Sequence, residues 1–398
     1  MKVVIIGGGA SGITSAITAR RKGYDVVVLE KNSSLLKKLK ITGNGHCNYY
    51  NEDQDLCHYH SDNSELISMM INSVNLKNVS LFFDSIGIIP RIKNGYYYPF
   101  SNQAISVCSS LILEAQKLGV VLDTDVEVQE VKKSNRFQII TTKGVYEADK
   151  VIVSTGGMSY QKTGSDGFGY KELKRLGHNI KLLLPGLTPL IIANPKKEWK
   201  GIRTDVSISL LENNKLVRKE SGEIQLTEDG ISGICTMQLS SYISKGLYLG
   251  KDERIKINFL PFIDEDKFFV FMDNRSKKMK NRTIMELLEG VLNYKLISVI
   301  LKKEQNLIWD ECNNKEREFI KKNLLSYMVE VVDTKSFNYS QVTLGGVSLL
   351  EVNLETMESK KVKDLYITGE LLDITGDCGG YNLTIAWITG LIAGECLW

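Results

Sequence analysis

A glycine-rich turn close to the N-terminus is the part of the sequence whose residue types and spacing best suit ligand binding. Gly7, Gly9 and Gly12 follow the order Gly-x-Gly-x-x-Gly, and an acidic residue, Glu30, follows at the spacing of a dinucleotide-binding unit. The first glycine permits a tight turn, the second lets a pyrophosphate approach the backbone, and the third lets a helix pack closely on a strand. A carboxylate at Glu30 can accept hydrogen bonds from ribose hydroxyls and would repel a 2′-phosphate. The pattern predicts that the chain binds a dinucleotide through its adenosine diphosphate half.

Strands and a helix of the right kind surround this turn. Residues 3–6 are a continuous apolar run rich in β-branched side chains, which favours a strand buried on both faces of a parallel sheet. Apolar residues then recur at helical spacing until Gly23, and residues 26–29 form a second apolar strand. The start of the helix, at Ala10 and Ser11, would offer free N–H groups to a phosphate. A glycine turn without a ligand is the alternative, and the strand, helix and acid in register argue against it.

Two later segments repeat the order of a strand followed by glycine. Residues 151–153 are a buried-strand run followed by Ser154-Thr155-Gly156-Gly157, and residues 365–368 are a short apolar strand followed by Gly369-Glu370. Near the end of the chain, Gly379-Gly380 opens a helix. Glycines let a ligand approach the backbone, and a helix opened by glycines can direct its N–H groups at one. An ordinary strand-ending turn and a helix that merely closes the fold are the alternatives. We expect a Rossmann-type fold built from both ends of the sequence.

Longer stretches of the sequence resemble a known family. The matching motifs lie at residues 38–48, 154–160, 163–170, 230–233, 345–347, 356–360, 369–373 and 379–383. In this order, over nearly the whole chain, they are similar to those of a bacterial family of FAD-dependent oxidoreductases that includes a bile-acid-inducible flavoprotein and an aminoacetone oxidase. The family usually carries Arg at the position of His46 and Gly at that of Leu36, so the role of His46 stays open.

The resemblance implies FAD as the cofactor and a set of residues that hold it. The backbone of Val128 would read the adenine edge, and the helix opened by Gly379-Gly380 would stabilise the negative charge that develops on the flavin ring upon reduction. The predicted cofactor-binding residues are Gly7, Gly9, Ala10, Ser11, Gly12, Glu30, Lys31, Lys38, Thr42, Gly43, Asn44, Cys47, Asn48, Val128, Thr155, Gly156, Gly157, Gly369, Glu370, Asp373, Gly379, Gly380, Tyr381, Asn382 and Leu383.

The pattern of the middle of the chain is different. Alternating segments at 205–210, 216–219, 223–226 and 255–259, broken at Asn213-Asn214 and Ser221-Gly222, predict a small antiparallel barrel or sandwich. Helical spacing runs from about residue 264 to 328. The expected fold class is α/β, a Rossmann-type FAD-binding domain with an inserted small β-barrel domain and a nested helical subdomain. We expect the Rossmann-type domain at residues 1–190 and 344–398. The β-barrel domain is expected at 191–262 and 329–343, and the helical subdomain at 263–328.

Composition excludes several classes of protein. The 398-residue chain is 43% hydrophobic and 24% charged, the balance of a globular protein. Its seven cysteines show no CxxC spacing, so we expect no disulfide framework, no metal site and no disulfide reductase. Neither a signal peptide nor an apolar run of roughly 18 residues is present, so we expect a cytoplasmic protein without a membrane partner. The net charge of +3 weighs against a nucleic-acid partner, and the basic residues from Arg275 to Arg282 favour a solvated helix face over an anion or RNA site.

A flavin would supply hydride chemistry, and the substrate must be inferred separately. We expect an NAD(P)H-driven reductase of a small organic molecule, for example one with an activated C=C bond. Because no second Gly-x-Gly-x-x-Gly marks a nicotinamide site, NADH or NADPH would bind transiently against the flavin. The alternatives are an amine oxidase that uses O2, as the aminoacetone-oxidising relative implies, and an FAD-binding protein that modifies or binds RNA. His46 and Tyr160 are the candidate proton donors, with a structural role as the alternative for each.

Overall fold

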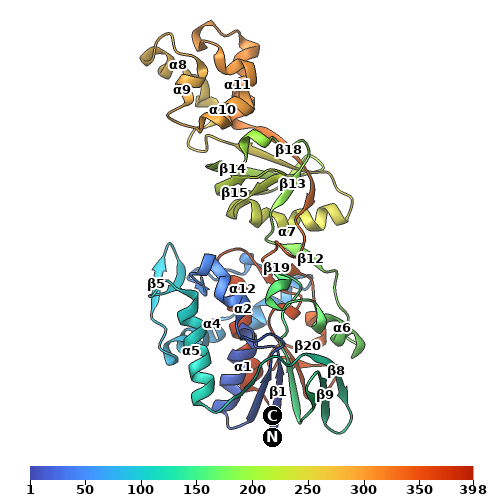
Figure 1. Cartoon of the computed structure of the whole chain (residues 1–398). Helices are drawn as coiled ribbons and strands as arrows, with labels where there is room; N and C mark the ends of the chain where they lie inside the picture. Colours follow the sequence, from blue (N-terminus) through green and yellow to red (C-terminus); the bar gives the residue numbers. More distant parts are fainter. Residues whose placement is uncertain (398) are drawn as a thin grey trace. The chain divides into compact units, whose positions relative to one another are not determined.

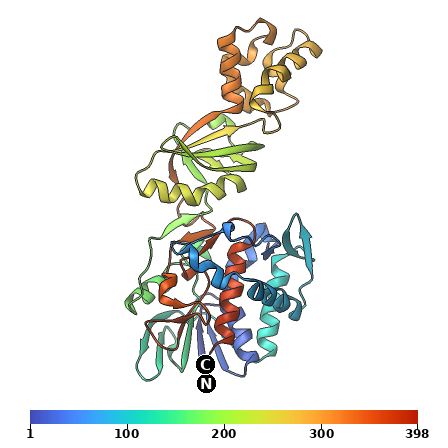
Figure 2. The ribbon, with the colours of Figure 1, turned by 180° about the vertical axis from the view of Figure 1, so that it is seen from behind.

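The computed structural model describes residues 1–397, which divide into two compact units (Figures 1 and 2). Unit 1 contains residues 1–184 and the C-terminal segment that begins at Gln341, and unit 2 contains residues 185–340. The N-terminal and C-terminal segments, blue and red in Figure 1, lie together in unit 1. Each unit has a hydrophobic core of its own.

Unit 1 is built on a seven-stranded sheet with the order β20-β21-β22-β11-β1-β2-β7. The parallel strands are β1 (Lys2–Ile6), β2 (Asp25–Leu29), β7 (Val121–Asp123), β11 (Lys150–Val153) and β22 (Leu365–Ile367), and the antiparallel edge is β20 (Val352–Asn353) and β21 (Glu358–Ser359). β1 pairs with β2 on one side and with β11 on the other, and β11 pairs in turn with β22 from the end of the chain. Both ends of the sequence therefore contribute parallel strands to one sheet, as predicted.

Two helices of unit 1 pack unusually closely. α1 (Ala10–Arg21) follows β1, and α12 (Tyr381–Glu395), the red helix at the centre of unit 1 in Figure 2, lies along it. A Cβ atom at Gly390 would lie 2.7 Å from the backbone oxygen of Ser11, and one at Gly394 would lie 2.7 Å from that of Ser15. Only glycine allows the two backbones to approach in this way. The position of α12 along α1 is thus fixed by backbone contact.

Shorter elements complete unit 1. Two small antiparallel sheets are β8 (Val128–Lys133), β9 (Phe137–Thr141) with β10 (Gly144–Ala148), and β3 (Tyr50–Asn51), β6 (Tyr96–Pro99) with β5 (Pro90–Lys93). β4 (Tyr59–His60) pairs with β23 (Thr375–Gly376). The remaining helices are α2 (Lys37–Ile41), α3 (Ile67–Met70), α4 (Ser73–Ser85), α5 (Ala104–Lys117) and α6 (Phe168–Arg175). β12 (Leu184–Gly186) and β19 (Val342–Leu344) lie where the chain leaves unit 1 and returns to it.

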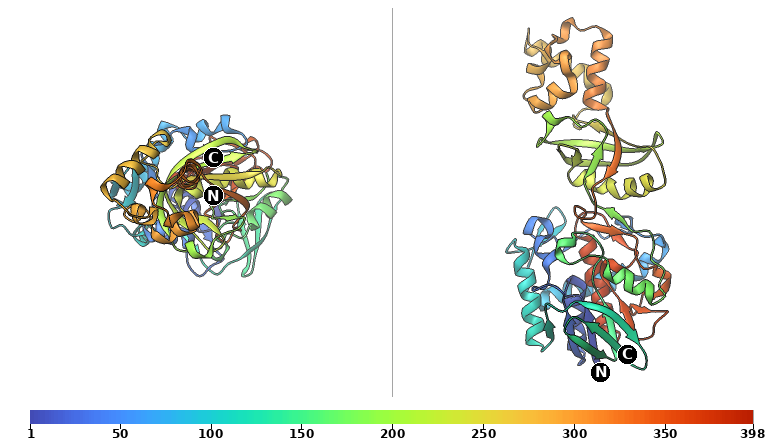
Figure 3. Two further views of the ribbon diagram at one scale, coloured as in Figure 1. Left: turned by 90° about the horizontal axis from the view of Figure 1, so that it is seen from above. Right: turned by 45° about the vertical axis from the view of Figure 1, so that its right-hand side comes forward.

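Unit 2 combines a closed barrel with a group of helices (Figure 3). The barrel strands, in order, are β13 (Leu190–Ile192), β16 (Gly230–Ser232), β15 (Lys215–Leu226), β14 (Arg203–Glu212), β17 (Glu253–Asn258) and β18 (Tyr327–Thr334). The helices are α7 (Ile234–Tyr248), which packs on the barrel, and α8 (Phe268–Lys278), α9 (Ile284–Leu288), α10 (Tyr294–Leu301) and α11 (Asn314–Leu325). The expected fold class is confirmed, while the finer boundaries at residues 263 and 328 stay a prediction.

Two details of the barrel differ from the expectation. Asn213 and Asn214 form the predicted turn with φ angles of +48° and +64°, but the predicted break at Ser221-Gly222 is wrong. β15 continues through these residues because each is paired with β14, and Gly222 accommodates a φ of +148° that other residues rarely adopt. Helix α7 was not anticipated. No helix within residues 1–397 is long and apolar enough to cross a membrane.

One barrel residue is buried without a partner. Glu253, at the start of β17, is 1% exposed, and neither oxygen of its carboxyl group accepts a hydrogen bond from the described residues. Burial is the main cause, and the charge of Glu212, directly opposite on β14, the second, of a rise in the pKa of Glu253 from its ordinary 4.5 to about 7. The folded protein therefore prefers the protonated form of Glu253, so its contribution to stability falls as the pH rises from about 4.5 to about 7.

We predict that Glu253→Gln increases the free energy of unfolding at pH 8 by roughly 1–3 kcal/mol, because the amide removes the cost of burying a charge. At pH 5 the substitution should have little effect, since Glu253 is then protonated in the folded protein. Urea denaturation at both pH values measures the difference, and Glu318→Gln, an exposed glutamate of α11, is the matched control. A stability difference that does not depend on pH would contradict the prediction.

Candidate cofactor site

The turn after β1 presents uncapped backbone N–H groups. No side chain caps the start of α1 at Gly9, and no acidic residue occupies its first turn. A Cβ atom at Gly7 would lie 2.5 Å from the backbone oxygen of Ser154, and one at Gly12 would lie 2.0 Å from that of Gly7, whereas one at Gly9 would meet nothing within 4 Å. Gly7 and Gly12 thus serve packing, and Gly9 faces open space. This arrangement fits an anionic group such as a pyrophosphate.

Glu30 is held directly beside this turn. It is 9% exposed; its Oε2 accepts from the backbone N–H of Gly8 at 2.9 Å, and its Oε1 accepts from the backbone and side chain of Asn32 at 2.9 and 2.6 Å. The start of β8, where Val128 lies, is close by because the N–H of Val126 donates to the backbone oxygen of Glu30 at 3.0 Å. A carboxylate has about four acceptor sites, so Glu30 can also accept from ribose hydroxyls. Asn32, which orients the acid, was not predicted.

The segment after residue 160 lies against the same loop. Lys31 pairs with Asp166 at 2.7 Å, and the side chain of Asn32 donates to the backbone oxygen of Thr163 at 3.1 Å. A Cβ atom at Gly164 would lie 2.5 Å from Nδ2 of Asn32. The predicted binding residue Lys31 is therefore engaged in an ion pair that fixes the 163–166 segment beside Glu30.

Glu370 connects three of the predicted segments. Its Oε2 accepts from Lys38 of α2 at 2.8 Å and from the N–H of Gly157 at 3.4 Å, and its Oε1 accepts from the N–H of Thr343 at 2.8 Å. The hydroxyl of Tyr170 donates to the backbone oxygen of Glu370 at 2.7 Å. Lys38, Gly157 and Glu370 were predicted as site residues. Thr343 and Tyr170 were not, because their roles depend on tertiary contacts.

The loop from Leu36 to Asn48 follows a strained path. Leu36, Asn44 and Cys47 adopt φ angles of +58°, +53° and +57°, and Gly43 between them has +54°. The related family usually has glycine at the position of Leu36, which matches this left-handed conformation. The Leu36 side chain is 2% exposed, so its burial offsets the backbone strain.

The start of α12 is a second uncapped helix N-terminus. Gly380, with φ +97°, precedes the helix, and no side chain caps it. Oδ1 of Asn48 is buried without a hydrogen-bond partner and lies beside Gly380. Asn382 fixes the preceding loop, since its side chain donates to the backbone oxygen of Gly376 at 2.7 Å and accepts from the N–H of Gly376 at 2.8 Å. Free N–H groups and an unsatisfied amide oxygen fit a polar ring edge that both donates and accepts.

The two helix N-termini are offset along the helix axis. Because Gly390 lies beside Ser11, the first eight residues of α12 extend past the start of α1. At 1.5 Å per residue this offset is about 12 Å. The chain thus has two sites suited to negative charge, one beyond the other, as an elongated dinucleotide cofactor requires.

Four further predicted site residues have well-defined environments. Asp373 is 4% exposed and accepts from the N–H of Asp62 at 3.2 Å. Cys47 is fully buried, and burial raises the pKa of its thiol to about 12, so it stays a neutral thiol. His46 is exposed, and its Nδ1 lies 2.8 Å from the backbone oxygen of Asn102. Tyr160 is half-buried with a φ of +52°. The contact of His46 anchors a loop.

Two histidines that were not predicted as site residues share one carboxylate. Nε2 of His60 lies 2.8 Å from Oδ1 of Asp377, and Nδ1 of His58 lies 3.2 Å from Oδ2. Their spacing in the sequence could have indicated this cluster. His58 and His60 are two residues apart, and side chains two apart in an extended chain point to the same side. Within residues 1–397, no group of three or more His, Cys, Asp or Glu side chains is placed to hold a metal ion.

The chain is similar over nearly its whole length to one protein family and to two known enzymes. The model of the HI0933-like protein Rossmann domain matches residues 1–396. The 3-dehydro-bile acid delta(4,6)-reductase of Clostridium scindens is 36% identical over 99% of this chain and 98% of its own length. The ribosomal RNA dihydrouridine synthase of Escherichia coli is 26% identical over 96% of this chain and 94% of its own length.

The fold is also similar to that of solved structures. The open conformation of a flavocytochrome c3 fumarate reductase has a TM-score of 0.52 and 14% identity, and the alignment covers 100% of this chain and 78% of that chain. These comparisons confirm the predicted family and the Rossmann-type FAD-binding fold, and they support the predicted class of enzyme, an FAD-dependent oxidoreductase.

We predict that Gly9→Val abolishes cofactor binding and leaves the protein folded, because a side chain there meets no other part of the chain but fills the space in front of the α1 N–H groups. Gly12→Val should instead reduce the amount of folded protein, since its Cβ would lie 2.0 Å from the oxygen of Gly7. Bound flavin, read from absorbance at constant protein concentration, and circular dichroism separate the two effects. Stoichiometric flavin in the Gly9→Val protein would show that this turn does not face the cofactor.

Proposed function

Since the chain belongs to the HI0933-like family of Rossmann-domain proteins, we propose that it is an FAD-dependent reductase of C=C bonds conjugated with a carbonyl group. The observation that carries this proposal is the pair of uncapped helix N-termini, at Gly9 and Gly380, in a chain that resembles two reductive enzymes over nearly its whole length. Each N-terminus favours negative charge, one at a pyrophosphate and the other at a reduced ring.

The residues of unit 1 fit FAD in both halves of the cofactor. Gly9, Ala10 and Ser11 would hold the pyrophosphate through backbone N–H groups, and Glu30 would accept from the adenosine ribose. Asn48 and the start of α12 at Tyr381 would contact the polar edge of the ring. When bound, FAD would supply the chemistry of hydride transfer between a donor and the substrate.

The two relatives have a chemical feature in common. The name of the Clostridium scindens protein describes reduction of ring double bonds in a bile acid whose C3 is oxidised to a ketone, and that of the Escherichia coli protein describes formation of dihydrouridine from uridine. In both substrates the C=C bond that is reduced is conjugated with a carbonyl group. A carbonyl makes the distal carbon electrophilic, so a hydride can add there. We assign the same bond type to this protein, with NADH or NADPH as the electron donor.

We predict that the purified protein contains FAD and that its anaerobically reduced form is reoxidised by 2-cyclohexen-1-one or by a 3-oxo-4,6-diene bile acid, but not by cyclohexanone. Cyclohexanone is the matched control because it has the carbonyl and lacks the C=C bond. Chromatography of the heat-released flavin and stopped-flow absorbance make the two measurements. Recovery of FMN, or reduction of the flavin by amines with reoxidation only by O2, would contradict the proposal.

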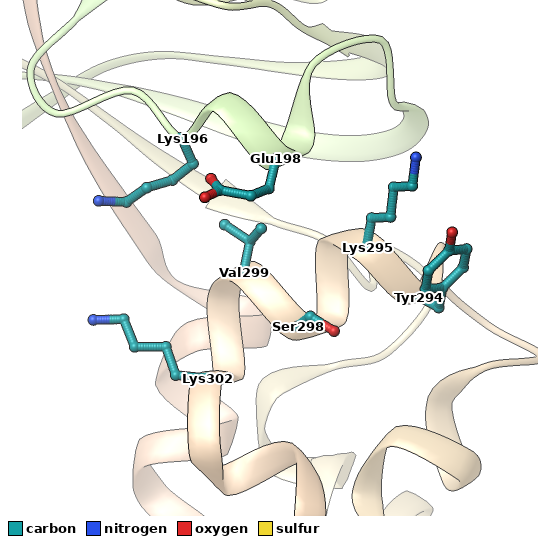
Figure 4. Close-up of a pocket in the computed structure, with 7 residues that line it drawn as sticks. All are labelled: Lys196, Glu198, Tyr294, Lys295, Ser298, Val299 and Lys302. Carbon is teal, nitrogen blue, oxygen red and sulfur yellow. The ribbon is translucent and has the colours of Figure 1, made fainter.

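A second candidate function is action on RNA, and a groove in unit 2 supports it. The groove, of about 490 Å³, lies between the residues around Lys197–Trp199 and helix α10. Its lining residues are Lys196, Glu198, Tyr294, Lys295, Ser298, Val299 and Lys302. Figure 4 shows Lys196 and Glu198 on one side and the α10 residues on the other. The lining has three lysines and one glutamate, and Tyr294 is 55% exposed, so phosphates and a stacked base could both bind here.

The basic residues from Arg275 to Arg282 are not among the residues that line this groove. The Arg275 side chain donates to the backbone oxygen of Leu287 at 2.7 Å and lies over the ring of Phe271, 5.5 Å from its centroid. Arg275 therefore joins α8 to α9. The lysines of the groove are the better test of an RNA partner.

We predict that the triple variant Lys196→Glu, Lys295→Glu, Lys302→Glu weakens binding to a ribosomal RNA fragment by at least about tenfold and lowers the salt dependence of binding, because each lysine lost removes a phosphate contact. The triple variant Lys117→Glu, Lys171→Glu, Lys174→Glu makes the same charge change in unit 1 and is the control. Filter binding at two salt concentrations is the measurement. Equal weakening by both variants would point to net charge alone, and no RNA binding by the unaltered protein would exclude this candidate.

A further inference from the structure

Two imidazoles shield one buried carboxylate beside the start of α12. Asp377 is 3% exposed, whereas the side chains of His58 and His60 are 25% and 28% exposed. Both oxygens of Asp377 face a histidine nitrogen. The carboxylate is therefore placed to hold the two rings, which stay partly exposed.

His58 faces negative charge at both ring nitrogens. Its Nδ1 lies 3.2 Å from Asp377, and its Nε2 lies 3.1 Å from Oδ2 of Asp53. A neutral imidazole donates one N–H, whereas an imidazolium donates two. An imidazolium at His58 would satisfy both contacts by donating one N–H to each carboxylate.

Backbone and ring contacts fix the cluster to the start of α12. The ring of His58 stacks on Tyr381, the first residue of α12, with centroids 4.6 Å apart and planes 18° apart. The N–H of Asp377 donates to the backbone oxygen of His58 at 2.9 Å, and His60 pairs with Thr375 across β4 and β23. The two histidines therefore lie at the end of α12 where the proposed function places the reactive ring.

The other two of the four histidines are engaged elsewhere. His178 has a fully buried side chain and lies between Glu351 at 3.2 Å and Ser359 at 2.9 Å. His46 contacts the backbone oxygen of Asn102. His58 and His60 are thus the histidines that combine a buried anchor with an accessible ring.

We propose that His58 and His60 form the proton-donating side of the substrate site and that Asp377 positions them. This inference rests on the proposed function. Reduction of a conjugated C=C bond adds a hydride to the carbon distal to the carbonyl, the π bond breaks, and a proton is added to the adjacent carbon. The substrate is reduced by two electrons, the reduced cofactor is oxidised, and the proton comes from a histidine N–H that solvent later restores.

The test compares the unaltered protein with the double variant His58→Gln, His60→Gln, which keeps polar side chains and removes the transferable protons. Turnover of 2-cyclohexen-1-one should fall by about 100-fold or more, the range typical of a lost general acid. Binding of para-chlorophenol, whose oxygen would accept from the histidines, should weaken at least about tenfold in a flavin absorbance titration. FAD content should not change, because neither histidine belongs to the pyrophosphate or ribose contacts.

Glu351→Gln is the matched control, since it removes the carboxylate from another His–carboxylate pair of unit 1. It should leave turnover and phenol binding unchanged. Should the double variant lose its flavin, the single variants are compared in the same way, because each keeps one imidazole on Asp377. Full turnover and full phenol binding in a flavin-loaded variant would overturn the inference. If the unaltered protein reduces no conjugated substrate, the proposed function fails, and the phenol titration alone decides whether the histidines bind an oxygen ligand.

Discussion

The close contact between α1 and α12 is the constraint on which the architecture of unit 1 depends. Gly390 and Gly394 let the last helix of the chain lie against the backbone of the first, and this contact sets how far α12 extends beyond the carboxyl end of the sheet. Two helix N-termini, at Gly9 and Gly380, are then about 12 Å apart along the axis. A side chain at either packing glycine would separate the helices and move the second N-terminus.

The electrostatics of unit 1 follow from leaving those N-termini uncapped. Acidic side chains are kept out of both first turns and are tied down nearby, with Glu30 held by Gly8 and Asn32, and Glu370 held by Lys38. Negative charge is therefore supplied by the ligand, and the positive ends of the helix dipoles are not neutralised by the chain. The same arrangement explains how one fold can bind a phosphate and also stabilise a reduced ring.

Local signals in the sequence were enough to predict the parts of the fold with strict backbone requirements. The glycine turn, the buried strands and the glycine-opened helix at Gly380 each depend on residues within one short segment, and all were predicted. The barrel strand through Ser221-Gly222 was not, because its pairing with β14 overrides a local turn signal. His58 and His60 lie more than 300 positions from Asp377 in the sequence, so their shared contact can be recognised only in the folded chain.

A crystal structure of the protein with FAD and a conjugated ketone tests the central claim most directly. The account predicts the pyrophosphate at the N–H groups of Gly9 to Ser11, the polar edge of the flavin ring at the start of α12, and the ketone with its C=C bond between the ring and His58. A flavin bound with its ring away from Tyr381, or a pyrophosphate away from Gly9, would contradict it.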